Sequence, residues 1–81
     1  MEREEIFQLL KNIYAGSKLF EVIEIDAQTN LFTLKNWNNL NIFFQYKIDR
    51  ECETITICSI TGYFKRVYFI SEISKGMVML C

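Results

Sequence analysis

The chain has 81 residues, of which 51% are hydrophobic and 15% are aromatic, and its formal net charge is −1. A chain of this length forms a single domain, residues 1–81, that buries roughly 60–65% of its unfolded surface. The composition is too apolar for a disordered chain, and the near-zero net charge excludes a strong general attraction to nucleic acid or acidic membranes. The sequence contains no histidine, which removes the commonest general base and metal ligand.

The cysteine pattern and the start of the sequence predict a cytoplasmic protein. Cys52, Cys58 and Cys81 form no C-x-x-C motif, and their odd number is typical of reduced thiols. The first residues are rich in glutamate, whereas a secretory signal begins with positive charge. No apolar run approaches the ~20 residues that span a bilayer, so we expect no membrane segment. We predict no metal and no cofactor, because the cysteine spacings do not match a zinc site and the glycines are isolated.

Residues 2–15 are predicted to form a helix. Ile6, Leu9, Leu10, Ile13 and Tyr14 follow the i, i+3, i+4, i+7, i+8 spacing that places apolar side chains on one face of a helix. Glutamates near the start and a lysine near the end suit the helix dipole. We therefore expect the apolar face of this helix to pack against the core.

After the helix, apolar residues recur at every second position, which predicts strands. The predicted strands cover residues 18–25, 32–35, 40–48, 53–59, 64–71 and, as a short sixth strand, 77–81. The first and fifth of these are apolar on both faces, so their inner faces have to be chosen. The residues that we expect to face the core in these two strands are Leu19, Ile23, Ile25, Val67 and Phe69.

Loop lengths set the register between neighbouring strands. A three-residue loop at 37–39 pairs Leu34 with Ile42, places Trp37 at the loop tip and allows Asn39 the left-handed conformation that such loops need. The alternative two-residue turn would bury a lysine, so we prefer the longer loop.

The two later loops give further expectations about register. A four-residue loop at 49–52 places Tyr46 opposite Ile55. A three-residue loop at 61–63 places Val67 opposite Ile57. Tight loops between successive strands produce an antiparallel meander.

The fold class is therefore α+β, with an N-terminal helix followed by a five- to six-stranded antiparallel meander over residues 18–81. Two arrangements remain open at this point. One is a twisted open sheet with the helix on one face. The other is a small barrel of the size of Sm and SH3 domains, in which the first strand lies beside the fifth or sixth.

The apolar residues on the predicted outer faces exceed what a monomer of this size can cover. Interface cores favour aromatic residues and arginine, and the outward set is of this kind. We predict that partner binding involves Phe20, Val22, Trp37, Phe64, Arg66, Tyr68 and Ile70. The predicted function is a non-catalytic protein-interaction module, of an adaptor, regulator or inhibitor type, that docks on a partner protein or on a second copy of itself. If the chosen strand faces are wrong, these residues lie inside one monomer instead.

The enzymatic alternative rests on one carboxylate. Glu21 shares the predicted inner face of the first strand with three apolar residues, and a buried carboxylate can act as a general acid or base. A position at the rim of a barrel or a pairing with a lysine explains Glu21 equally simply. We therefore predict that the protein is not an enzyme and has no catalytic residues.

Residues 62–69 combine aromatic and basic side chains on one predicted strand, and in part they resemble the aromatic strand with which RRM domains stack RNA bases. The order of one N-terminal helix and five antiparallel strands resembles the Sm-like small barrels in architecture. These resemblances imply binding to RNA or single-stranded nucleic acid. This function is our alternative and ranks second, because the basic residues are scattered along the sequence among ten acidic ones.

Overall fold

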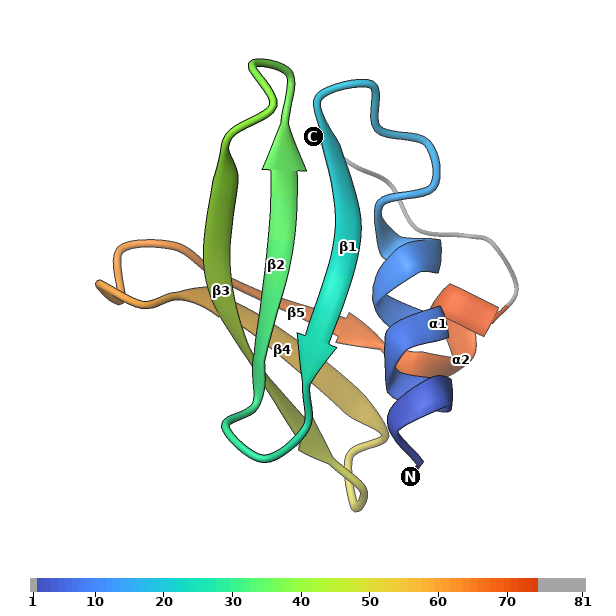
Figure 1. The fold of residues 1–81 in the computed structure, drawn as a ribbon. Coiled ribbons are helices and arrows are strands. Elements are labelled where there is room, and N and C mark those ends of the chain that lie inside the picture. Colours follow the sequence, from blue (N-terminus) through green and yellow to red (C-terminus); the bar gives the residue numbers. More distant parts are fainter. Residues whose placement is uncertain (1, 75–81) are drawn as a thin grey trace.

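The computed structural model describes residues 2–74 (Figure 1). The elements in chain order are α1 (Arg3–Ile13), β1 (Phe20–Asp26), β2 (Leu31–Asn36), β3 (Asn41–Asp49), β4 (Thr54–Ser59), β5 (Lys65–Phe69) and α2 (Ile70–Ser74). The predicted sixth strand at 77–81 and most of the turn before it lie outside the described residues.

The N-terminal helix forms where its periodicity predicts. Ile6, Leu9, Leu10 and Ile13 of α1 are buried, and the acidic residues of the first turn lie at the positive end of the helix dipole. The helix packs against β1 and α2. Within residues 2–74, no helix is long and apolar enough to cross a lipid bilayer.

The five strands form one antiparallel sheet in the order β1-β2-β3-β4-β5. Figure 1 shows β1, β2 and β3 side by side, with β4 and β5 running across behind them. The nine-residue strand β3 belongs to both halves, since its first part pairs with β2 and its last part pairs with β4. The predicted α+β meander is confirmed, and of the two arrangements left open the sheet is twisted and open.

The core lies on the inner face of this bent sheet and is covered by α1. Phe32 of β2 is at its centre, because its ring lies 6.0–6.4 Å from the rings of Tyr14, Phe44 and Tyr46. The buried apolar residues are Ile6, Leu9, Leu10, Ile13, Val22, Ile25, Phe32, Leu34, Tyr46, Ile55, Ile57 and Ile73.

The predicted pairing of β2 with β3 is confirmed. Leu34 lies opposite Ile42, and Asn39 adopts the expected left-handed conformation with φ of 60°. The side chain of Asn36 holds the loop, because its Oδ1 atom accepts hydrogen bonds from the backbone N–H groups of Asn38 and Leu40 at 2.9 and 3.0 Å. Trp37 lies in this loop and is exposed, as predicted.

The predicted faces of β1 are wrong over most of the strand. Val22 is only 4% exposed, whereas Leu19 and Ile23 are exposed. The reason is a β-bulge between Val22 and Glu24, which leaves Ile23 without a partner in β2. A bulge inserts one residue and reverses the alternation beyond it, so that Val22 and Ile25 both face the core.

The pairing of β3 with β4 is shifted by two residues from the prediction, so Tyr46 lies opposite Ile57 rather than Ile55. The loop has four residues, as predicted, but it begins after Asp49. The carboxylate of Asp49 accepts hydrogen bonds from the backbone N–H groups of Glu51 and Cys52 at 3.0 and 3.1 Å, which fixes this start. A shift of two keeps every side chain on its predicted face.

The pairing of β4 with β5 is shifted by one residue, which reverses the predicted faces of β5. Ile57 lies opposite Arg66 instead of Val67. The loop is one residue longer than predicted, because Phe64 closes it by donating its backbone N–H to Oγ of Ser59 at 3.0 Å. Gly62 supplies the positive φ of 84° that this turn requires. Arg66 and Tyr68 consequently face inward, and Val67 is among the residues that face outward.

The predicted strand at 64–71 ends earlier than expected, and a short helix follows it. Ile70 begins α2, and its backbone N–H donates to the carbonyl oxygen of Glu53 in the β3–β4 loop at 2.9 Å. Ile70 packs against the core and Ile73 is buried in it. Ile70 was expected to face outward in a strand, and α2 turns it toward α1 instead.

Replacing Leu10 tests the packing of α1. Leu10 is 0% exposed, so Leu10→Ala should lower the free energy of unfolding by about 2–5 kcal/mol, because it removes buried methyl groups and leaves a cavity. Leu40→Ala is the matched control, since Leu40 is 61% exposed, and it should change stability by less than about 0.5 kcal/mol. Urea unfolding followed by circular dichroism measures both, and equal losses would show that α1 does not cover the core.

Replacing Tyr46 tests a polar group in the core. The hydroxyl of Tyr46 is buried and has no hydrogen-bond partner among residues 2–74, and burial raises the pKa of this side chain. Tyr46→Phe should therefore raise the free energy of unfolding by about 1 kcal/mol, because it removes an unsatisfied buried group. Tyr63→Phe is the control, since Tyr63 is 96% exposed. Destabilisation by Tyr46→Phe would show that the hydroxyl has a partner.

Candidate functional site

A pocket opens between the beginning of β1 and the beginning of β5, the strands at the two edges of the sheet within residues 2–74. Its volume is about 410 Å³. We call it the aromatic pocket. Its walls come from the end of α1 and the start of β1 (Tyr14, Ser17, Leu19, Phe20), from the inner face of the sheet (Leu34, Phe44, Arg66, Tyr68) and from the β4–β5 loop (Ser59, Thr61, Tyr63, Phe64).

Two serines fix the loops that form the mouth of the aromatic pocket. Oγ of Ser17 accepts hydrogen bonds from the backbone N–H groups of Leu19 and Phe20 at 3.1 and 3.2 Å, which turns the chain from α1 into β1. Oγ of Ser59 does the same for Phe64 at the other side of the mouth. Short polar side chains that bond to nearby backbone groups favour such turns. Local hydrogen bonds therefore fix the backbone that carries the apolar side chains at the mouth.

A continuous series of aromatic rings lines the aromatic pocket and extends beyond it. The centroids of successive rings lie 5.9–6.4 Å apart, a spacing typical of favourable aromatic pairs. In order, the rings are Trp37, Phe20, Tyr14, Phe32, Phe44 and Phe64. Trp37 and Phe64, at the two ends of the series, are exposed, whereas Phe32 in its middle part belongs to the core. The aromatic pocket is thus an extension of the core to the surface.

The polar groups of the aromatic pocket are Arg66, tyrosine hydroxyls and the hydroxyls of its loops. Arg66 is its one charged residue among the described lining residues. The pKa of Tyr14 is raised to about 12, mainly by burial and also by nearby Tyr68, while Arg66 acts in the opposite direction. Tyr14 therefore stays protonated at neutral pH and offers an O–H donor beside the arginine. No acidic side chain from residues 2–74 lines this pocket.

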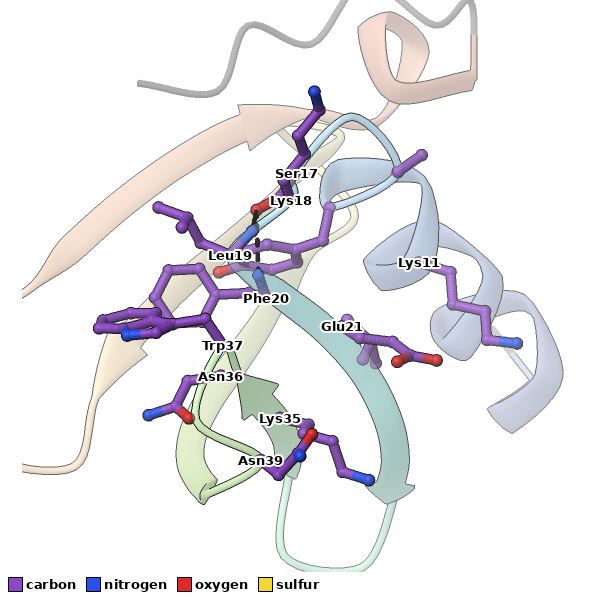
Figure 2. A pocket seen from close by; sticks show the side chains of 13 residues that line it. Lys11, Ser17, Lys18, Leu19, Phe20, Glu21, Lys35, Asn36, Trp37 and Asn39 are labelled. Atoms are coloured by element: carbon purple, nitrogen blue, oxygen red, sulfur yellow. Dashed lines mark hydrogen bonds between the residues drawn. The ribbon is translucent and has the colours of Figure 1, made fainter.

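A second pocket, of about 450 Å³, shares the wall made by Tyr14, Ser17, Leu19 and Phe20 (Figure 2). We call it the lysine pocket. Figure 2 shows the indole of Trp37 beside Phe20, with their ring centroids 5.9 Å apart. The charged residues that line the lysine pocket are Lys11 of α1, Lys18 of the α1–β1 loop, Glu21 of β1 and Lys35 of β2.

The fold sorts charges that are scattered along the sequence. Counting only residues 2–74, the two pockets together are lined by four basic residues and one acidic residue, namely Lys11, Lys18, Lys35, Arg66 and Glu21. Acidic residues gather at the lower end of Figure 1, where α1 begins and where the β1–β2 turn and the β3–β4 loop lie. These are Glu2, Glu4, Glu5, Asp26, Asp49, Glu51 and Glu53. A molecule with a net charge of −1 therefore has a basic end at the two pockets.

The predicted partner-binding residues are largely brought together, although not on an outer face. Phe20, Phe64, Arg66 and Tyr68 all line the aromatic pocket. Trp37 joins them through its contact with Phe20 and lines the lysine pocket. The other two predicted residues do not line the aromatic pocket. Val22 is buried in the core and also lines the lysine pocket, and Ile70 lies near the opposite end of α1, beside Glu5.

Sequence reasoning missed two features of the molecular surface. Tyr14 and Phe44 were assigned to the core alone, yet they form walls of the aromatic pocket. The outer face of the sheet exposes Phe43, Val67 and Phe69 instead of the predicted set. Phe43 was correctly placed on the outer face, as the one aromatic residue on the otherwise polar face of its strand, but it was not counted among the partner-binding residues. Nothing in the sequence indicated the other two.

The carboxylate of Glu21, which the sequence placed on an inner face, lies at the surface of the structure. The bulge in β1 places Glu21 outside, where it is exposed and lies opposite Lys35 of β2. Lys65 is likewise exposed, opposite Cys58 of β4. Among residues 2–74, no group of three cysteine or carboxylate side chains is arranged to hold a metal ion. The site offers apolar contact, hydroxyl groups and positive charge.

Comparison with known proteins gives no relative. No protein-family model, no curated protein and no solved structure matches the chain. The candidate site is therefore interpreted from its own geometry.

The pKa of Tyr14 predicts a loss of stability at high pH. A pKa of about 12 in the folded state, against 10.0 in the unfolded chain, means that the folded state holds this proton more tightly. The resulting stabilisation is complete below pH 10 and disappears as pH rises toward 12, with about 1 kcal/mol lost between pH 9 and pH 11. Urea unfolding at these two pH values should show a smaller loss for Tyr14→Phe than for the wild type. An identical loss would mean that Tyr14 is not buried.

Proposed function

We propose that the protein is a non-catalytic interaction module that binds an apolar segment of a partner protein in the aromatic pocket. The observation that carries this proposal is the convergence of four aromatic or basic residues, Phe20, Phe64, Arg66 and Tyr68, on one pocket at the surface. Aromatic residues and arginine are the types enriched at the energetic centres of protein interfaces. The cytoplasmic location expected from the sequence is part of this proposal.

The size of the aromatic pocket decides what kind of ligand it suits. Burying one large apolar side chain contributes about 1.5–3 kcal/mol, whereas association costs roughly 4–15 kcal/mol. The free energy from burying one side chain in the pocket therefore does not cover the cost of association, and the ligand must make further contacts along the surface. An extended protein segment provides them, since β1 and β5 border the pocket and each pairs with a single strand within residues 2–74.

Self-association through the outer face of the sheet is less well supported. Phe43, Val67 and Phe69 are each about half exposed. A phenylalanine carries about 150–250 Å² of surface, so the three together offer on the order of 300 Å². A standard interface buries about 800 Å² on each partner. This face alone is therefore too small for a stable dimer, and a partner segment in the aromatic pocket is the better proposal.

Binding of single-stranded nucleic acid is a second candidate, favoured by one specific observation. Trp37 is exposed and lies beside a pocket lined by three lysines. Exposed aromatic rings next to basic side chains are the usual means of holding unpaired bases. This candidate predicts that affinity falls steeply with salt, because phosphate contacts release counterions.

Peptide selection tests the proposed function. Random displayed peptides of about twelve residues, selected on the purified full chain, should share one large apolar residue. The affinity of a selected peptide should fall at least roughly tenfold on Phe64→Ala, because Phe64 forms the mouth of the aromatic pocket. Phe43→Ala is the matched control, since it removes an exposed phenylalanine from the outer face, and it should change affinity less than twofold.

The outcome that contradicts the proposed function is equally specific. Equal losses for Phe64→Ala and Phe43→Ala, or no enriched peptide at all, would reject a binding role for the aromatic pocket. Circular dichroism of both variants ensures that a loss of affinity does not reflect unfolding. Light scattering of the wild type, without peptide, distinguishes a partner segment from a second copy of the chain.

A further inference from the structure

The lysine pocket indicates what kind of protein segment the aromatic pocket binds. We infer that this segment is acidic as well as apolar, with carboxylates within a few residues of the apolar anchor. The inference rests on the proposed function and adds the chemistry of the ligand to it. The two pockets share four residues, so an extended segment, at ~3.3 Å per residue, passes from one to the other within a few positions.

The three lysines of the lysine pocket are available to carboxylates from outside. Within residues 2–74, the ion pair of the structure joins Arg3 to Glu4, and the ammonium groups of Lys11, Lys18 and Lys35 have no carboxylate partner there. Lys11 lies over the ring of Phe7 at 4.6 Å, which orients the ammonium group without neutralising it. Lys35 faces Glu21 across the β1–β2 pair but forms no ion pair with it.

The distribution of charge over the molecule strengthens the inference. The acidic residues at the beginning of α1 and in the β1–β2 and β3–β4 connections lie away from the pockets, so they do not cancel the lysines locally. An acidic segment would be repelled by that end and attracted to the two pockets. Charge complementarity of this kind orients a partner and raises its rate of association.

The local chemistry favours carboxylates over a phosphate backbone. The three lysines come from three different parts of the chain, as Figure 2 shows. Among the described residues that line the lysine pocket there is no arginine to form the bidentate contacts that suit phosphate. A few carboxylates spaced along a peptide match isolated ammonium groups better.

The test uses two variants of the full chain with the same change in charge. The first replaces the pocket lysines (Lys11→Gln, Lys18→Gln, Lys35→Gln). The second replaces three basic residues that line neither pocket (Lys47→Gln, Arg50→Gln, Lys65→Gln). The ligand is the tightest peptide selected on the wild type, together with a copy in which its acidic residues are changed to the corresponding amides.

The pocket-lysine variant should bind the selected peptide roughly tenfold more weakly than the wild type, because each of three exposed ion pairs is worth a few-fold in Kd. The control variant should bind within about twofold of the wild type. The amide copy of the peptide should bind wild type roughly tenfold more weakly than the acidic peptide and should lose its sensitivity to salt. This last measurement needs no variant, so misfolding cannot imitate it.

The possible failures are distinguishable. Selected peptides that need Phe64 but carry no acidic residues, and that bind both triple variants equally, would overturn the inference and leave the proposed function standing. Peptides that do not need Phe64, or the absence of any peptide, would overturn both. Binding of a twelve-nucleotide oligouridylate that is lost in the pocket-lysine variant, in place of peptide binding, would assign the two pockets to nucleic acid.

Discussion

The ring of Phe32 is the contact on which the rest of the structure depends. It is 1% exposed and lies within 6.4 Å of rings from the end of α1 and from both parts of the bent strand β3. A sheet of five short strands cannot bury a core against itself while it remains flat, and this chain is too short to supply a second sheet. Bending the sheet around Phe32 and covering the opening with α1 solves both problems. The bend also sets the two edge strands facing each other, and the aromatic pocket lies where they approach.

The sequence was sufficient to predict the two faces of a strand where apolar residues occur on one face and polar residues on the other. Residues 41–49 are apolar at every second position and polar in between, apart from Phe43, so their faces were predicted correctly. The register of the β2–β3 loop was predicted correctly because the alternative turn would bury a lysine, and Asn39 accepts the left-handed conformation that the longer loop needs. The strands that failed, β1 and β5, are apolar on both faces. For such strands hydrophobicity cannot choose the register, and a change of one residue reverses every side chain.

The two errors have the same physical origin but different local causes. In β1 a bulge changes the alternation in mid-strand, and in β5 the loop from Ser59 to Phe64 contains one residue more than expected. Both details depend on backbone hydrogen bonds that no pattern of hydrophobic residues records. Several of the residues predicted to bind a partner still lie together, because the faces of both strands are reversed. Phe20 and Tyr68 were both predicted on the outer face, but in the structure both lie on the inner face and line the same pocket.

The separation of basic and acidic residues into two ends of the molecule could not be predicted from the sequence, for a different reason. Lys11, Lys18 and Lys35 lie on three elements, and only the return of β2 alongside β1 and the packing of α1 bring them to one end. The charges of the basic end and of the acidic end nearly cancel in the net charge of −1, so the net charge indicates neither end. For a small protein the distribution of charge says more about its ligands than the total, because screening limits each charge to a range of about 10 Å.

The position of the aromatic pocket at the end of the aromatic core links binding to stability. Phe20 and Phe44 line the pocket and also pack against the buried core, so a side chain that fills the pocket adds a further contact to the core itself. A ligand that binds only the folded chain stabilises it by mass action, and a domain of this length has little stability to spare. In the proposed function, a side chain of the partner completes the hydrophobic core at the exposed rings of the mouth.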